Sequence, residues 1–110
     1  MPQQTIHDLI EFEHALQSPR LLLFKHSPAC PISQAARQHF EAFCRAEPDA
    51  VTAFVDVIAD RATARGIADR TGVRHESPQA ILFENGRAVW HASQHTITTA
   101  MLQAAWAPRC

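Results

Sequence analysis

Cys30 has the clearest chemical potential of any residue in this sequence. It follows the apolar run Leu21–Phe24 and directly precedes Pro31, which suits a first helical position because its missing N–H has no role there. The unpaired N–H groups at a helix start stabilise an anion such as a thiolate. Lys25 and His26, just upstream, would add positive potential if they face the sulfur. We therefore predict a nucleophilic cysteine, the alternative being a structural cysteine that caps the helix.

The motif Cys30–Ser33 (CPIS) is a monothiol version of the CxxC redox motif. A serine at its last position cannot close an internal disulfide. Cys44 lies 14 residues further along the same expected helix, about 21 Å away along the axis, whereas a disulfide needs Cα atoms within about 7 Å. Cys44 lies on the apolar stripe of this helix, which predicts that it fills the core. Cys110 could reach Cys30 only if the last residues fold back, so a resolving role for it stays open.

Composition narrows the class of protein. The chain has 110 residues, of which 46% are hydrophobic, and ten Lys+Arg against eleven Asp+Glu leave a net charge of −1. This balance lacks the basic surface that nucleic-acid binding requires. The longest run of large apolar side chains is too short to cross a bilayer, and no secretory signal is recognisable, so we expect a cytoplasmic protein. An odd number of cysteines also argues against a disulfide-stapled scaffold.

The elements that must position Cys30 alternate between helix and strand patterns. Asn85-Gly86 separates two strand-like runs and is a strong hairpin signal. A βαβ unit followed by a ββα unit predicts one α/β domain over residues 1–110, a thioredoxin-like fold with a mixed sheet covered by helices and an additional N-terminal helix. The expected elements are a helix over Thr5–Leu16, a strand over Arg20–Lys25, a helix from Pro31 ended by Pro48, a strand over Val51–Val57, a helix over Arg61–Thr71 followed by Gly72, strands over Gln79–Glu84 and Arg87–Ala92, and a helix from about Thr96.

Pro78 directly precedes the first strand of the hairpin. In thioredoxin-like folds, a cis-proline at this junction faces the reactive cysteine. The alternative is an ordinary trans proline at the start of an edge strand. Because only about 5–6% of X–Pro bonds in folded proteins are cis, the prediction of a cis bond rests on the fold.

Three segments together resemble the monothiol bacilliredoxins, which are thioredoxin-like proteins of bacteria that use bacillithiol instead of glutathione. The resemblance runs from about Leu21 to the last helix. It implies a thiol–disulfide oxidoreductase that removes bacillithiol from S-bacillithiolated proteins, with bacillithiol as co-substrate, no other cofactor, and no nucleic-acid or membrane partner. The segments are His26–Ser33 (HSPACPIS), His75–Gln79 (HESPQ), and Trp90–Ser93 (WHAS) with Ile97-Thr98.

The resemblance also implies which residues do the chemistry. Cys30 matches the reactive cysteine and Pro78 the cis-proline, with Pro31 and Ser33 completing the catalytic motif. Bacillithiol carries a malate with two carboxylates, so its pocket is expected to offer cations, although each candidate could equally be a solvated surface charge. The predicted substrate-binding residues are Ile32, Arg37, Arg74, His75 and Ser77.

Two other functions remain open at this point. One is a non-catalytic thioredoxin-fold binding module or stress adaptor, and the other is a thiol-ligated metal or cluster carrier. His91 and His95 are four residues apart, but at a strand end and loop this spacing does not bring two rings together. No metal site is therefore predicted. Trp90 and Trp106 are interpreted as packing aromatics.

Overall fold

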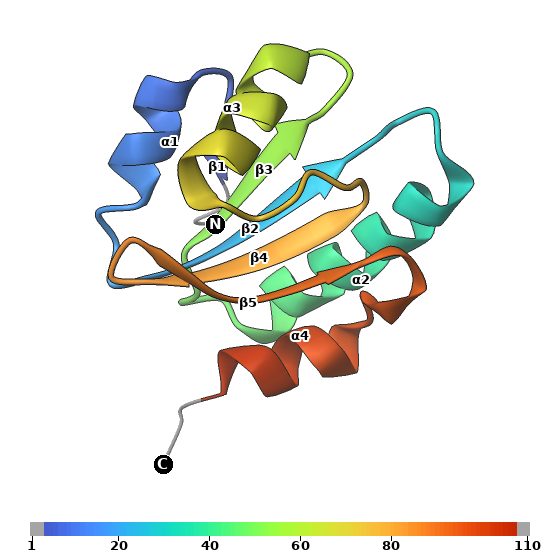
Figure 1. Cartoon of the computed structure of the whole chain (residues 1–110). Helices are drawn as coiled ribbons and strands as arrows, with labels where there is room; N and C mark the ends of the chain where they lie inside the picture. Colours follow the sequence, from blue (N-terminus) through green and yellow to red (C-terminus); the bar gives the residue numbers. More distant parts are fainter. Residues whose placement is uncertain (1–3, 108–110) are drawn as a thin grey trace.

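The computed structural model describes residues 4–107 and shows a mixed five-stranded sheet with helices on both faces (Figure 1). The strand order is β1-β3-β2-β4-β5, in which β3 runs parallel to β1 and β2, while β4 runs antiparallel to β2 and β5. The predicted thioredoxin-like fold is confirmed. The strands are β1 (Gln4–Thr5), β2 (Arg20–His26), β3 (Thr52–Asp56), β4 (Gln79–Glu84) and β5 (Arg87–Ser93), and the helices are α1 (Leu9–Ala15), α2 (Pro31–Ala46), α3 (Arg61–Thr71), the 3-10 turn η1 (Gln94–Thr96) and α4 (Thr99–Trp106).

The central strand β2 separates two hydrophobic cores. Its alternating side chains enter opposite layers, as strand geometry requires. Leu21 and Leu23 pack under α1 and α3, whereas Leu22 and Phe24 pack under α2 and α4. Figure 1 shows α1 and α3 over one face of the sheet and α2 and α4 over the other. The continuous apolar run is therefore explained by burial on both faces.

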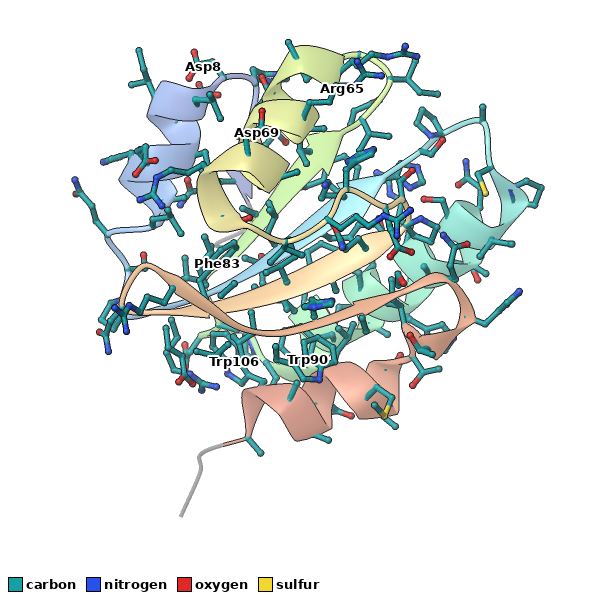
Figure 2. The ribbon with its side chains drawn as sticks, viewed as in Figure 1. Asp8, Arg65, Asp69, Phe83, Trp90 and Trp106 are labelled. Atoms are coloured by element: carbon teal, nitrogen blue, oxygen red, sulfur yellow. The ribbon has the colours of Figure 1, made fainter. Side chains whose placement is uncertain are left out.

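Two aromatic residues complete the layer between the sheet and α4. Trp90 of β5 and Trp106 of α4 are partly buried and pack against the second core (Figure 2). The Trp106 ring meets Phe43 edge-on at a centroid distance of 5.9 Å. The guanidinium of Arg20 lies 4.2 Å from the centre of the Trp106 ring on another side. The interpretation of both tryptophans as packing residues is confirmed.

The turns predicted from Gly and Asn positions occur where expected. Asn85 and Gly86 have φ values of 53° and 81° and join β4 to β5. Gly72 ends α3 in the left-handed region, with φ at 76°. Positive φ is unfavourable for most residues that carry a Cβ, whereas Gly adopts it freely and Asn tolerates it, so the residue types select the turns.

The N-terminal helix is shorter than predicted. The prediction of a helix over Thr5–Leu16 is wrong at its start, because α1 begins only at Leu9. The Asp8 carboxylate accepts the N–H of Glu11 at 2.8 Å and caps the helix there. The residues before it form β1 instead, and buried Ile6 follows the strand. The apolar spacing in this segment thus serves a strand and a helix in succession.

The C-terminal helix also starts later than predicted. A helix from about Thr96 is wrong, since α4 begins at Thr99 and is preceded by η1. The Thr98 hydroxyl caps α4 by accepting the N–H of Met101 at 3.1 Å. Smaller differences affect three strands: β2 extends to His26, β5 extends to Ser93, and β3 is one residue shorter at each end than expected. None of the helices between residues 4 and 107 has the length and apolar character that a bilayer crossing requires.

Candidate active site

Cys30 lies at the N-cap of α2, after a short turn that leaves β2. Its backbone is extended, with φ −111° and ψ 121°, and Pro31 is the first residue of the helix. The Cys30 N–H donates to the carbonyl of Ser27 at 3.1 Å, and its own carbonyl accepts the N–H of Gln34 at 3.1 Å. The side chain is half-buried. The sulfur therefore sits at the positive end of a 16-residue helix with partial access to solvent.

Ser33, the last residue of the motif, is fully buried and fastens the turn before Cys30. Its Oγ accepts the N–H of Ser27 at 2.9 Å and lies 2.8 Å from Nδ1 of His26. The hydroxyl thus links α2, the turn and the end of β2. This positioning role was not predicted from the sequence, where Ser33 was placed in the catalytic motif as a replacement for a second cysteine that could hydrogen-bond a thiolate.

Lys25 and His26 at the end of β2 are both buried, on opposite faces of the sheet. Burial lowers the pKa of Lys25 to about 8, against the opposing charge of Glu76. Burial and the charge of Arg37 also lower the pKa of His26, whose ring stacks on Phe24 at 5.9 Å. Within residues 4–107, neither Nζ of Lys25 nor Nε2 of His26 has a hydrogen-bond partner. Two buried nitrogen atoms without hydrogen-bond partners therefore lie at the end of β2, where the turn to Cys30 begins.

Pro78 follows a cis peptide bond from Ser77, as predicted. The next residue, Gln79, pairs with Lys25 across β4 and β2, which brings this bond to the same end of the sheet as the Cys30 turn. Gln94 fastens the segment from the other side. Its backbone N–H donates to the carbonyl of Pro78 and its side-chain amide to the carbonyl of Ser77, each at 3.2 Å. Sequence reasoning missed Gln94, because only the fold places η1 against Pro78.

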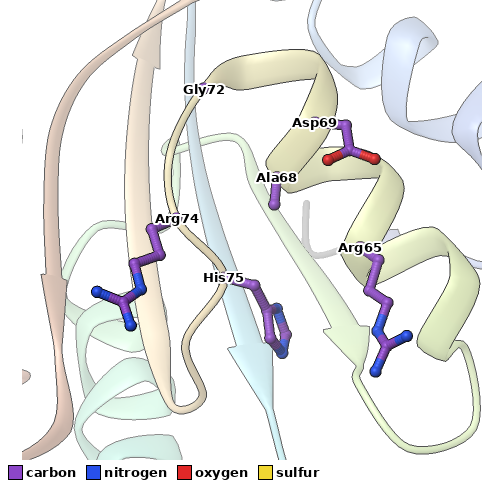
Figure 3. A pocket seen from close by; sticks show the side chains of 6 residues that line it. All are labelled: Arg65, Ala68, Asp69, Gly72, Arg74 and His75. Carbon is purple, nitrogen blue, oxygen red and sulfur yellow. The ribbon is translucent and has the colours of Figure 1, made fainter.

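The predicted substrate-binding residues divide between two sides of Cys30. His75 and Ser77 line a hollow together with Ser27 of the reactive turn. Burial and the charges of Lys25 and Arg65 lower the pKa of His75. The exposed Arg74 lines a neighbouring hollow with His75 and Arg65, and its side chain extends away from theirs in Figure 3.

Ile32 and Arg37 lie on α2, across the turn from His75. Arg37 pairs with Glu41 at 3.2 Å, and its guanidinium lies 5.0 Å from the centre of the Phe54 ring. Ile32 is half-buried and lines a small hollow with His39. The binding roles of these residues stay predictions.

The second thiol of the helix is a core residue, as predicted. Cys44 is 5% exposed, and its Sγ lies 3.8 Å from the hydroxyl oxygen of Thr52. Burial raises the pKa of the Cys44 thiol. Cys110 lies outside the described residues. In the part of the chain that is described, no group of three His, Cys, Asp or Glu side chains is placed to hold a metal ion, and His91 and His95 lie on β5 and η1.

Comparison with known proteins identifies the family. A family model described as monothiol bacilliredoxin BrxC matches residues 3–102. The chain belongs to this family. Its structure is similar to that of a candidate oxidoreductase with a thioredoxin fold, at a TM-score of 0.87 and 32% identity over 94% of this chain and 93% of that one.

Thioredoxins share the fold at lower identity. Mitochondrial thioredoxin 3 of Saccharomyces cerevisiae has a TM-score of 0.74 at 17% identity, over 93% of this chain and 91% of that one. Fasciola hepatica thioredoxin has a TM-score of 0.73 at 15% identity, over 93% and 94% of the two chains. Family membership and fold together assign thiol-redox chemistry to this bacilliredoxin, and its partners are proteins with modified thiols.

Proposed function

We propose that this bacilliredoxin removes bacillithiol from S-bacillithiolated proteins in the cytoplasm by thiol exchange at Cys30. One observation carries the proposal: the sulfur of Cys30 is half-buried at the start of α2, near the cis-proline end of β4, and Ser33 occupies the place of a second cysteine. The only other cysteine in the described residues, Cys44, is buried in the core. The site therefore offers a single reacting sulfur.

The exchange occurs in two balanced steps. The Cys30 thiolate attacks the bacillithiol sulfur of the mixed disulfide, forming a Cys30–bacillithiol disulfide while the client thiolate leaves and takes a proton from water. A thiolate of free bacillithiol then attacks the bacillithiol sulfur held on Cys30. This step forms bacillithiol disulfide and restores the Cys30 thiolate. Free bacillithiol is the reductant, because Ser33 cannot supply electrons.

Intact mass spectrometry of a mixture with a bacillithiolated model protein tests the proposal. The wild-type chain is expected to gain one bacillithiol on Cys30 while the client loses it. Cys30→Ala is expected to gain none, and Cys44→Ala serves as the matched control that still accepts it. Ser33→Cys is expected to lose the adduct, since an added thiolate would attack the Cys30 sulfur and release bacillithiol, leaving an internal disulfide.

Two results would contradict the scheme. One is a wild-type chain that never acquires the adduct, and if it binds the modified client without releasing it, a non-catalytic thioredoxin-fold module is the better description. The other is a Cys30–Cys110 disulfide that forms in place of the adduct. That disulfide would make Cys110 a resolving thiol.

A further inference from the structure

A hollow of about 290 Å³ opens beside the reactive turn, on the opposite side from Arg37. It includes Ser27, which accepts the Cys30 N–H, and Ser77, which precedes the cis bond to Pro78. A ligand in this space would therefore lie next to the Cys30 turn. The lining residues are Ser27, Val57, Ile58, Arg61, Arg65, His75 and Ser77.

The lining is basic and contains no carboxylate. Arg61 and Arg65 are four residues apart on α3, which places them on the same face of the helix. Neither forms an ion pair with any residue between positions 4 and 107, unlike Arg37 and Arg70. Figure 3 shows the Arg65 and His75 side chains extending toward the same end of the sheet. Two guanidinium groups are thus available to an incoming anion.

Lys25 adds an unsatisfied positive group behind His75. Its side chain is 0% exposed, and its Nζ has no hydrogen-bond partner among the described residues. Its cross-strand partner Gln79 likewise keeps an unpartnered buried oxygen. Burial and then the charge of Lys25 lower the pKa of His75. Glu76 is the acidic group that opposes Lys25. A buried ammonium without a hydrogen-bond partner attracts an anion more strongly than a solvated one.

We propose that this hollow binds the carboxylates of the small thiol, with Arg61 and Arg65 as the donors, the buried ammonium of Lys25 as a further positive charge, and His75 as part of the lining. The inference rests on the proposed thiol exchange and assigns the residues that determine specificity for the carboxylate end of its small thiol. The volume is slightly below the roughly 300–1,000 Å³ of whole small-molecule sites. The hollow therefore has room for one end of such a thiol, and Ser27 in its lining places that end next to the Cys30 turn.

Paired mixed disulfides test the proposal. One model client carries bacillithiol and the same client carries β-mercaptoethanol, which has no charge. In the double variant Arg61→Gln/Arg65→Gln, kcat/KM for the bacillithiol disulfide is expected to fall roughly tenfold or more, about the loss of a charge-assisted hydrogen bond. The β-mercaptoethanol disulfide is expected to react as with wild type. Arg87→Gln is the matched control, since this exposed arginine lies beside the hairpin turn at the opposite end of β4 and β5.

Each outcome of the paired assay has a separate meaning. Equal slowing of both disulfides would overturn the proposal, since the arginines would then contact the client and not the small thiol. No change for either disulfide would also overturn it while leaving the thiol exchange intact. A wild-type chain that exchanges neither disulfide would refute the proposed function.

A second measurement tests the cationic site without any disulfide. The rate of Cys30 alkylation is compared for iodoacetate, an anion, and iodoacetamide, its uncharged analogue. The rate with iodoacetate divided by the rate with iodoacetamide is expected to fall severalfold in Arg61→Gln/Arg65→Gln and to stay unchanged in Arg87→Gln. An unchanged ratio in the double variant would overturn the site even if thiol exchange fails.

Discussion

Beyond the partly exposed Arg20–Glu84 pair, the β2–β4 pair is buried throughout but is built differently toward its two ends. At one end, Leu21–Phe24 faces Ala80–Phe83, and none of these side chains is more than 1% exposed. At the other end, Lys25, His26 and Gln79 are just as inaccessible, yet Nζ, Nε2 and Oε1 of these three residues have no hydrogen-bond partner in residues 4–107. Burying polar groups without partners costs stability. This end also holds the Cys30 turn, so three of the four buried side-chain atoms without a partner in residues 4–107 lie beside the site of the chemistry, and the fourth, Nη2 of Arg20, lies at the other end of β2.

Truncating a large side chain in the apolar part of the β2–β4 pair is expected to give the largest effect on stability. Phe83 is 1% exposed and meets Phe12 edge-on at 5.7 Å. Phe83→Ala should lower the free energy of unfolding by about 3–5 kcal/mol, measured by urea denaturation. The alkylation rate of Cys30 in the folded variant should stay unchanged, because the cavity opens at the far end of β4. A folded variant in which Cys30 is alkylated ten times more slowly would show that the two ends are coupled.

The two cysteines of α2 are expected to differ in native labelling by at least about 100-fold. Cys30 is half-buried at the helix start, whereas burial in the core shields Cys44 and raises its pKa. Time-resolved mass spectrometry after a pulse of iodoacetamide measures both rates in one sample. In urea above the unfolding midpoint the two rates should converge. Rapid native labelling of Cys44 would contradict its core position.

Making the polar end apolar is expected to stabilise the fold. The pKa of Lys25 falls from 10.5 to about 8 on folding, so the unfolded chain binds more protons between these pH values and stability rises with pH across that window. Lys25→Met should raise the free energy of unfolding at pH 7 by roughly 1–3 kcal/mol and remove this rise. Urea denaturation at pH 7 and pH 10 measures both effects. A variant less stable than wild type at pH 7 would show that the ammonium has a stabilising partner.

The smallest expected effect concerns the turn that precedes Cys30. Ser33→Ala removes the acceptor of the Ser27 N–H and should lower the free energy of unfolding by about 1 kcal/mol. Amide hydrogen exchange at Ser27 should become faster, while exchange at Leu23 in the middle of β2 reports the global stability and serves as the internal control. Unchanged protection at Ser27 would mean that Ser33 does not hold the turn.

Local sequence signals predicted the elements whose geometry depends on a few adjacent residues. The Asn85-Gly86 hairpin and the Gly72 helix end follow from the positive φ that these positions require. The run Leu21–Phe24 predicted the central strand, because only burial on both faces explains four consecutive large apolar residues. The cis bond before Pro78 needed the fold as a whole.

Features that depend on tertiary placement were beyond the sequence. A two-residue strand such as β1 exists only because β3 offers it a parallel edge. The periodicity over Thr5–Leu16 could not show where Asp8 would start the helix. Arg61 and Arg65 were not singled out, since nothing in the order of residues places α3 beside the Cys30 turn. The partition of the predicted substrate-binding residues, with Arg37 on one side of Cys30 and His75 on the other, likewise appears only in three dimensions.

Lys25 is the only lysine in the sequence, and it is completely buried. Acylating reagents and enzymes that modify lysine side chains therefore find no accessible lysine on the folded chain. Any acyl group found on Lys25 records a molecule whose β2–β4 end has opened. An acyl group would prevent the Lys25 side chain from returning to its charged, buried state. Modification at this one position would therefore hold this end of the β2–β4 pair in its open conformation.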